Sequence, residues 1–149
     1  MDQTRPILDQ LNIVSGNVEA SIAFYRRLGV KIPDERVWRT PTGPHHVSAI
    51  TDEAMTLDLD STAFAKTWNT GWRGRDDLPG RVVVGFGVSS REEVDRLYGE
   101  MTAAGYRGLQ PPYDAFWGAR YAMIEDPDGL AVGLMSPASD EHRAPPPPV

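Results

Sequence analysis

The sequence predicts an α+β fold made of two successive modules, each with the element order βαβββ. The same order of a strand, a helix and three short strands can be followed twice along the 149 residues. Apolar residues of the two series also repeat at one spacing, because Leu11 and Phe86 stand 75 positions apart, and so do Leu57 and Val132. Two copies of one element order at a fixed spacing are the signature of an internal repeat.

The first module spans residues 7–60. Its segment "ILDQLNIV" alternates apolar and polar residues, as a half-buried strand does. Asn17 is a residue type that caps helix N-termini, and Gly29 can end the following helix in a left-handed conformation. Turns that carry Pro and Gly separate three short strands expected after this helix, at residues 36–40, 45–51 and 55–60.

The second module spans residues 81–137. It starts with the strand "RVVVGFGV", and Ser90 with Glu93 forms the pattern of a capping box at the start of a helix. The three strands expected after this helix lie within residues 107–115, at 119–126 and at 131–136.

Two segments lie outside the modules. Residues 61–80 form an intermodule loop rich in Trp, Gly and Arg, and long loops in compact domains are often functional. Residues 138–149 end in a proline run and have no apolar periodicity, so we expect a flexible tail. Residues 1–137 then make a single domain.

Composition excludes several kinds of chemistry. The chain has no cysteine, which removes disulfides, thiolate zinc sites and cysteine nucleophiles. Its net charge of -6 argues against binding to nucleic acid, which needs a cationic face. It shows neither an apolar run that could cross a bilayer nor a signal-peptide pattern, so we expect a cytoplasmic protein with no membrane partner.

Three motifs carry a resemblance to a known family. They are "SIAFYRRLGV" in the first module, and "SREEVDRLYGEMTAAGY" and "EDPDGLAVGLMSP" in the second. The chain resembles the glyoxalase, bleomycin-resistance and extradiol-dioxygenase family, the vicinal oxygen chelate superfamily. The resemblance implies that each module forms half of a cupped mixed sheet around a cavity, and that modules pair in a homodimer.

The resemblance also places a metal site. Metal-dependent members hold His and Glu ligands on the first and fourth strands of each module, and strand alternation puts Gln10, Asp58, Gly85 and Gly133 at those positions. Two glycines supply no donor, and an amide with one carboxylate is a poor set for Zn, Ni or Fe. We therefore expect no metal and no cofactor.

Glycines within the strands of the second module allow two interpretations. Gly85, Gly87 and Gly133 are all expected to face the cavity. A glycine within a strand marks the close approach of a ligand or of another backbone, and it also accommodates a bulge or a large neighbouring side chain. For three glycines on one wall we favour a ligand surface.

The remaining candidates are aromatic and polar. Flat aromatic rings suit a planar ligand, although tryptophan is also ordinary core material. Asp58 and Asp60 should point into the cup, where Arg39 or a ligand amine would pair with them, or where solvent would cover them. His45 and His46 are adjacent, so only one can face inward. The candidate ligand-binding residues are Gln10, Asn12, Trp38, His46, Asp58, Asp60, Trp68, Trp72, Gly85, Tyr113, Phe116, Trp117, Tyr121 and Gly133.

These features lead to two hypotheses. The first is a non-catalytic, metal-independent protein that sequesters a planar or partly apolar small molecule, such as an antibiotic-type natural product, for resistance or self-protection. The alternative is an enzyme. It would be a cofactor-free cyclase, isomerase or hydrolase that uses Asp58, His46 or Tyr121, or an atypical metal-dependent lyase or dioxygenase.

Overall fold

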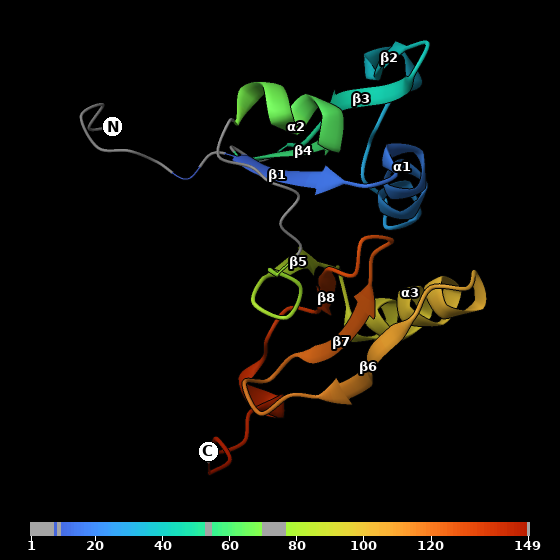
Figure 1. The fold of residues 1–149 in the computed structure, drawn as a ribbon. Helices are drawn as coiled ribbons and strands as arrows, with labels where there is room; N and C mark the ends of the chain where they lie inside the picture. The colour runs from blue at the N-terminus through green and yellow to red at the C-terminus, as the bar shows by residue number, and fades with distance from the viewer. Residues whose placement is uncertain (1–7, 9, 53–54, 70–76, 149) are drawn as a thin grey trace, which may run out of the picture. The chain divides into compact units, whose positions relative to one another are not determined.

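The computed structural model describes residues 8, 10–52, 55–69 and 77–148. The chain divides into two compact units, Met1–Arg75 and Asp76–Val149, and each is described by itself (Figure 1). Each unit contains one βαβββ module, as the repeat in the sequence predicts.

Unit 1 holds a four-stranded mixed sheet with the strand order β1-β4-β3-β2. β1 runs parallel to β4, and the other neighbours are antiparallel. The elements are β1 (Gln10–Ser15), α1 (Val18–Arg27), a 3-10 turn (Asp34–Arg36), β2 (Trp38–Thr40), β3 (Gly43–Ser48), β4 (Thr56–Ser61) and α2 (Thr62–Trp68).

Helix α1 covers one face of this sheet. The Asn17 side chain accepts a hydrogen bond from the Ala20 amide at 3.0 Å, which satisfies one of the free N–H groups at the helix start. Ile22 on the helix and Val47 and Leu59 on the strands are at most 1% exposed. Strand alternation therefore turns the polar residues of β1 and β4 to the opposite face, which we call the inner face of unit 1.

Unit 2 repeats this arrangement with the strand order β5-β8-β7-β6. Ser90 caps α3 by accepting a hydrogen bond from the Glu93 amide at 3.2 Å, as the sequence predicts. The core includes Val94, Ile124 and Val132, each 0% exposed. The elements are β5 (Val83–Gly87), α3 (Arg91–Ala103), β6 (Gly108–Asp114), β7 (Arg120–Glu125), β8 (Ala131–Met135) and a 3-10 turn (Asp140–His142).

The "EDPDG" motif forms the turn between β7 and β8. Asp126 is buried, and its Oδ1 accepts hydrogen bonds from the amides of Asp128 and Leu130, both at 2.9 Å. Gly129 adopts a φ of 87°, which a residue without Cβ reaches at little cost. The turn sets the start of β8 and hence the position of Gly133.

The spacing of 75 residues holds for only part of the repeat. In unit 1 Leu11 is the parallel partner of Leu57, but in unit 2 Val84, not Phe86, is the partner of Val132. The two modules thus differ by two residues in the register of the first strand. A shift of two residues keeps every side chain on its face, because the side-chain period of a strand is two.

Two segments outside the modules differ from the sequence prediction. The predicted loop 61–80 contains the helix α2, while residues 70–76 lie outside the described residues. The predicted flexible tail 138–149 is bonded to unit 2 along part of its length. Ser139 donates its N–H to the Gly118 carbonyl at 3.1 Å, and Ala144 donates to the Phe116 carbonyl at 2.9 Å. No helix among the described residues is long and apolar enough to cross a membrane.

Candidate functional site

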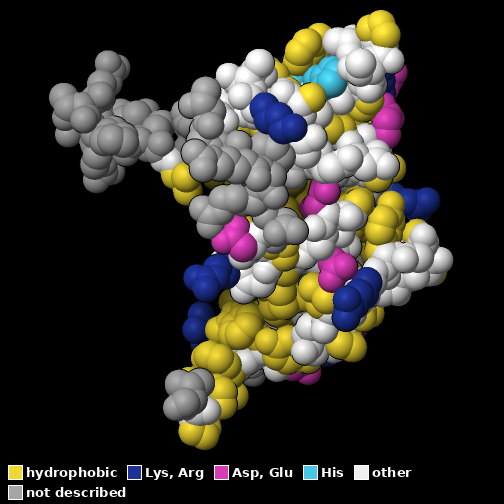
Figure 2. All heavy atoms as spheres, in the orientation of Figure 1, with side chains coloured by type: hydrophobic (Ala, Val, Ile, Leu, Met, Phe, Trp, Pro, Cys, Tyr) yellow, Lys and Arg dark blue, Asp and Glu magenta, His cyan; other side chains and the backbone are white. Residues whose placement is uncertain are grey.

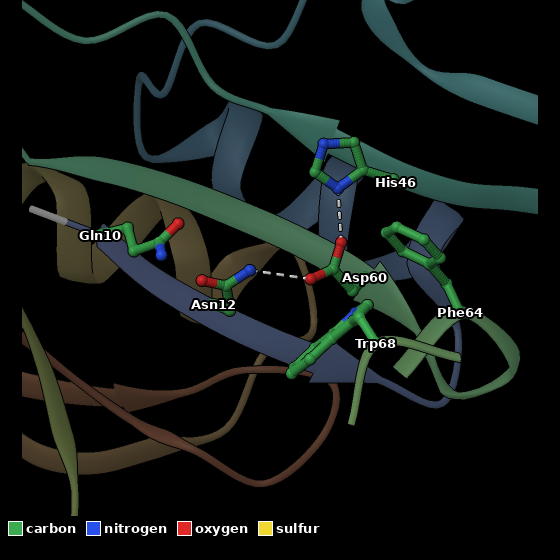
Figure 3. Close-up of a pocket in the computed structure, with 6 residues that line it drawn as sticks. All are labelled: Gln10, Asn12, His46, Asp60, Phe64 and Trp68. Atoms are coloured by element: carbon green, nitrogen blue, oxygen red, sulfur yellow. Dashed lines mark hydrogen bonds and ion pairs between the residues drawn. The ribbon is translucent and has the colours of Figure 1, made fainter. Parts of the chain in front are cut away.

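An open pocket of about 480 Å³ lies on the inner face of unit 1 (Figure 3). Polar side chains from three neighbouring strands form its floor, and two aromatic side chains of α2 form its wall. The lining residues are Gln10 and Asn12 on β1, His46 on β3, Asp60 on β4, and Phe64 and Trp68 on α2.

Asp60 organises the floor of the pocket. It is 1% exposed, and each carboxylate oxygen has a partner: Oδ1 lies 2.5 Å from His46 Nδ1, and Oδ2 accepts from Asn12 Nδ2 at 2.9 Å. A carboxylate that accepts at both oxygens needs a donor on each side, so Nδ1 of His46 is the protonated ring nitrogen. The pairing satisfies a buried charge that would otherwise be costly.

The adjacent histidines point to opposite faces of β3, as expected for neighbours on a strand. His46 lies on the inner face and is one-third exposed. His45 bonds elsewhere, with Nδ1 2.8 Å from Ser61 Oγ and Nε2 2.7 Å from Thr42 Oγ1. The single inward histidine that the sequence predicts is therefore His46.

Asp58 lies beside the pocket rather than among its lining residues. It is 7% exposed, and its Oδ1 is buried without a hydrogen-bond partner among the described residues. Its Oδ2 receives a long contact of 3.5 Å from Asn12 Nδ2. The expected pairing with Arg39 is wrong, because Arg39 binds Glu19 at 2.8 Å and Asp34 at 3.0 Å on the far side of the module.

The aromatic wall includes a residue that the sequence analysis missed. Phe64 meets the His46 ring edge-on, with the ring centroids 5.5 Å apart. Trp38 packs behind it, 5.2 Å from the Phe64 centroid, and is outside the pocket lining. Trp68 lines the pocket, whereas Trp72 lies outside the described residues. The signal for Phe64 was its helical spacing of four residues from Trp68, directly after the capping residue Ser61.

The aromatic candidates of the second module meet one another in unit 2. Trp117 is their centre, with ring centroids at 5.3 Å to Phe116, 5.6 Å to Tyr121 and 6.4 Å to Tyr113. Burial raises the pKa of the Tyr121 phenol, and the neighbouring Tyr113 adds to this shift. Tyr121 therefore stays a neutral hydrogen-bonding group at physiological pH.

Gly133 lies beneath the ring of Tyr121. A Cβ at Gly133 would stand 2.6 Å from Tyr121 Oη and 3.1 Å from two ring carbons. At this position the structure matches the interpretation that glycine accommodates a large neighbouring side chain. Gly85 and Gly87 differ, because a Cβ at either would meet no atom within 4 Å.

The donors at the positions of the family's metal ligands do not fit such a site. Gly85 and Gly133 offer no side-chain donor, and Tyr121 fills the space above Gly133. In unit 2 Gly85 is the parallel partner of Gly133. In unit 1 the parallel partner of Asp58 is Asn12, not Gln10. The described part of the chain also holds no group of three or more His, Asp or Glu side chains placed to bind one metal ion.

Comparisons with solved structures agree on the fold. A glyoxalase/bleomycin resistance protein/dioxygenase from Nocardioides is 24% identical, with a TM-score of 0.68 over 91% of this chain and 86% of that one. A glyoxalase-related enzyme from Fulvimarina pelagi is 21% identical, with a TM-score of 0.72 over 88% of each chain. TioX from Micromonospora sp. ML1 is 19% identical, with a TM-score of 0.65 over 88% of this chain and 98% of that one. At this level of identity the likeness shows the fold alone.

A family model matches residues 7–134, which include the first module and the second as far as Leu134 in β8. None of the curated proteins matches the chain. With two βαβββ modules in place and a match that extends over most of the sequence, the chain belongs to the Glyoxalase/Bleomycin resistance protein/Dioxygenase superfamily.

Proposed function

We propose that the protein binds a planar or partly apolar small molecule, without a metal ion, in the pocket on the inner face of unit 1. One observation carries the proposal: an aromatic wall, Phe64 and Trp68, faces a floor of hydrogen-bonding groups organised by Asp60. Small-molecule sites combine apolar walls with a few placed polar groups in this way, and about 480 Å³ lies within their usual range of volumes.

The pocket suggests how the ligand lies. Trp68 on α2 is 44% exposed, so its indole offers a flat surface to a planar ring. The amide of Gln10 and the imidazole of His46 line the same pocket and offer hydrogen bonds to the edge of that ring (Figure 3). The polar floor would then orient the ligand, and the aromatic wall would supply its binding affinity.

The role that we propose for this binding is sequestration of an antibiotic-type natural product, for resistance or self-protection in the cytoplasm. The family description names a bleomycin resistance protein, which supports a role of this kind. The resemblance to the family also supports a homodimer of paired modules.

A second candidate function is a cofactor-free enzyme, a cyclase or isomerase. The observation that favours it is the contact of 2.5 Å between His46 Nδ1 and the buried Asp60. A carboxylate that orients an imidazole in this way is a common arrangement for general acid-base catalysis.

Metal content and ligand titration on the untagged full chain test the proposal together. We expect no stoichiometric metal by mass spectrometry, and we expect calorimetry to show binding of planar compounds such as acridine or naphthalene derivatives. A bound compound recovered unchanged supports a binding protein, whereas conversion that is lost in His46→Phe supports the enzyme. Stoichiometric metal would contradict the proposal.

Two variants of α2 localise the site. Trp68→Ala removes the exposed indole and should weaken binding about tenfold, which corresponds to about 1.4 kcal/mol. Lys66→Ala lies on the same helix outside the pocket lining and should stay within about twofold. Equal effects of the two substitutions would indicate that the ligand binds outside this pocket.

A further inference from the structure

We infer that the ligand of the unit 1 pocket carries a hydroxyl on a planar conjugated system, a phenol or an enol, which donates a hydrogen bond to Nε2 of His46. The inference rests on the proposed function and adds the chemical class of the ligand. It makes His46 the specificity-determining residue and makes Asp60 a positioning residue.

The hydrogen bonds of Asp60 determine which ring nitrogen of His46 carries the proton. Both oxygens of Asp60 accept hydrogen bonds, from His46 at 2.5 Å and from Asn12 at 2.9 Å. When the imidazole is neutral, its proton therefore lies on Nδ1, and Nε2 carries the lone pair. In this neutral form the ring presents an acceptor at Nε2, and a ligand that fits it must donate.

The second ring nitrogen of His46, Nε2, is the one that a ligand can reach. The Asp60 side chain is only 1% exposed at the pocket floor, whereas the His46 side chain is 33% exposed and offers a ligand far more contact surface. In Figure 3 the second ring nitrogen lies on the side of the imidazole away from Asp60. Its contact among the described residues is Ser48 Oγ at 3.5 Å, a distance at which a hydrogen bond is weak. A ligand hydroxyl would improve on this contact.

The surroundings of the acceptor identify what carries the hydroxyl. Phe64 stands edge-on to the His46 ring at 5.5 Å, and Trp68 lines the same pocket. Because Phe64 and Trp68 line the pocket together with His46, a ligand that contacts His46 from the pocket also meets aromatic side chains, against which a planar conjugated system packs well. A hydroxyl directly on such a system is also a stronger donor than an aliphatic alcohol.

The charges around the pocket favour a hydroxyl over a carboxylate as the ligand group that meets His46. Two carboxyl groups, Asp58 and Asp60, are already buried on this face, and Asp58 Oδ1 has no hydrogen-bond partner within the described part of the chain. Among the six described residues that line the pocket, none is Lys or Arg. A third carboxylate would meet like charge without a fixed cation, which disfavours its binding. The ligand should therefore be neutral at the group that meets His46.

Three small nitroarenes test the inference on the full-length protein: 4-nitrophenol, 4-nitroanisole and 4-nitrobenzoate. The three compounds share the aromatic ring and the nitro group, and they differ in the substituent that would contact His46. At a buffer pH at which 4-nitrophenol keeps its proton and nitrogen NMR shows a neutral His46 ring, we expect calorimetry to show 4-nitrophenol binding about tenfold tighter than 4-nitroanisole, the effect of about one hydrogen bond. 4-Nitrobenzoate should bind no better than 4-nitroanisole.

A pair of variants assigns the preference to one nitrogen. His46→Phe keeps an aromatic ring without the acceptor, so the ratio of the two affinities should fall to about one. His45→Phe on the same strand removes a histidine that faces the other way, and it should leave the ratio at about tenfold. Persistence of the preference in His46→Phe would overturn the inference.

Nitrogen NMR of the wild-type protein tests the tautomer without any substitution. The neutral ring of His46 should carry its proton on Nδ1, and a proton on Nε2 would overturn the inference. Equal binding of 4-nitrophenol and 4-nitroanisole would also overturn it and leave the proposed function standing. Binding of neither compound overturns it as well, and the acridine and naphthalene titrations then decide separately whether the proposed function stands.

Discussion

Gly133 and Tyr121 form a packing pair on the neighbouring strands β8 and β7. The strands place Met123 opposite Gly133, and Tyr121 is diagonal to it. The tyrosine ring lies over the glycine because no Cβ blocks it. Packing an aromatic ring over a strand glycine compensates for the side chain that the glycine lacks. Gly133 thus positions Tyr121, which in turn contacts Trp117.

Replacing this glycine should disturb the ring above it. Gly133→Ala puts a Cβ 2.6 Å from Tyr121 Oη, so we expect a loss of about 1–3 kcal/mol in the free energy of unfolding, as for other overpacked sites. Gly85→Ala is the matched control, because its Cβ meets open space on the partner strand, and its effect should stay within about 0.5 kcal/mol. Urea denaturation measures both, and equal losses would contradict the role of Tyr121.

Alternation explains why several residues of the site could be named in advance. Asn12 and Asp60 share the inner face of unit 1 because strand side chains alternate between two faces and Ile13 and Leu59 occupy the other. Their contact at 2.9 Å needs the register as well, which sequence alternation does not contain. Hence the face was predictable, and the choice of Asp60 over Asp58 as the pocket carboxylate was not.

At the scale of elements, α2 is the part of the site that the sequence analysis assigned to a loop. Its seven residues are too few for a persuasive apolar period, and isolated helices of this length are unstable in water. Packing against β1, β3 and β4 stabilises it instead. Ser61 caps its start by accepting from the Phe64 amide at 3.0 Å, and it also lies 2.8 Å from His45 Nδ1.

The Ser61 cap should affect both stability and ligand binding. Ser61→Ala removes the cap of α2, the helix that carries the two aromatic residues of the pocket wall. We therefore expect a loss of about 0.5–2 kcal/mol in stability together with weaker binding of acridine. Ser90→Ala removes the equivalent cap of α3 and should cause a similar stability loss without a change in binding. Thermal denaturation and calorimetry separate the two effects. Unchanged binding in Ser61→Ala would show that α2 does not shape the site.

At the scale of the whole chain, the C-terminal segment extends the second module beyond its last strand. Residues 139–144 make backbone hydrogen bonds to the loop at Phe116 and Gly118, and Trp117 forms a bridge with Arg143. Figure 2 shows hydrophobic side chains gathered toward this end of the chain on the visible face of unit 2. The aromatic cluster around Trp117 therefore depends in part on the segment that composition predicts to be a tail.

Two truncations test this dependence. A chain that ends after Pro137 loses the bonds at Ser139 and Ala144, so it should lose about 1–2 kcal/mol of stability and show red-shifted tryptophan emission as Trp117 gains solvent. A chain that ends after Ala144 keeps these bonds and should match the full chain in both measurements. If both truncations behave alike, the bonds at Ser139 and Ala144 contribute nothing measurable.

The sequence by itself determined the two βαβββ modules, the caps at Asn17 and Ser90, the turn at "EDPDG" and the inward faces of the strands. These features depend on local conformation and on the period of side chains, and both are written in short stretches of chain. Only the tertiary structure decided that Phe64 joins Trp68 at the pocket, that Tyr121 covers Gly133, and that His46 rather than Arg39 pairs with Asp60. Each of these contacts joins different elements, so strand register and helix packing set its distance, and no local pattern records either one.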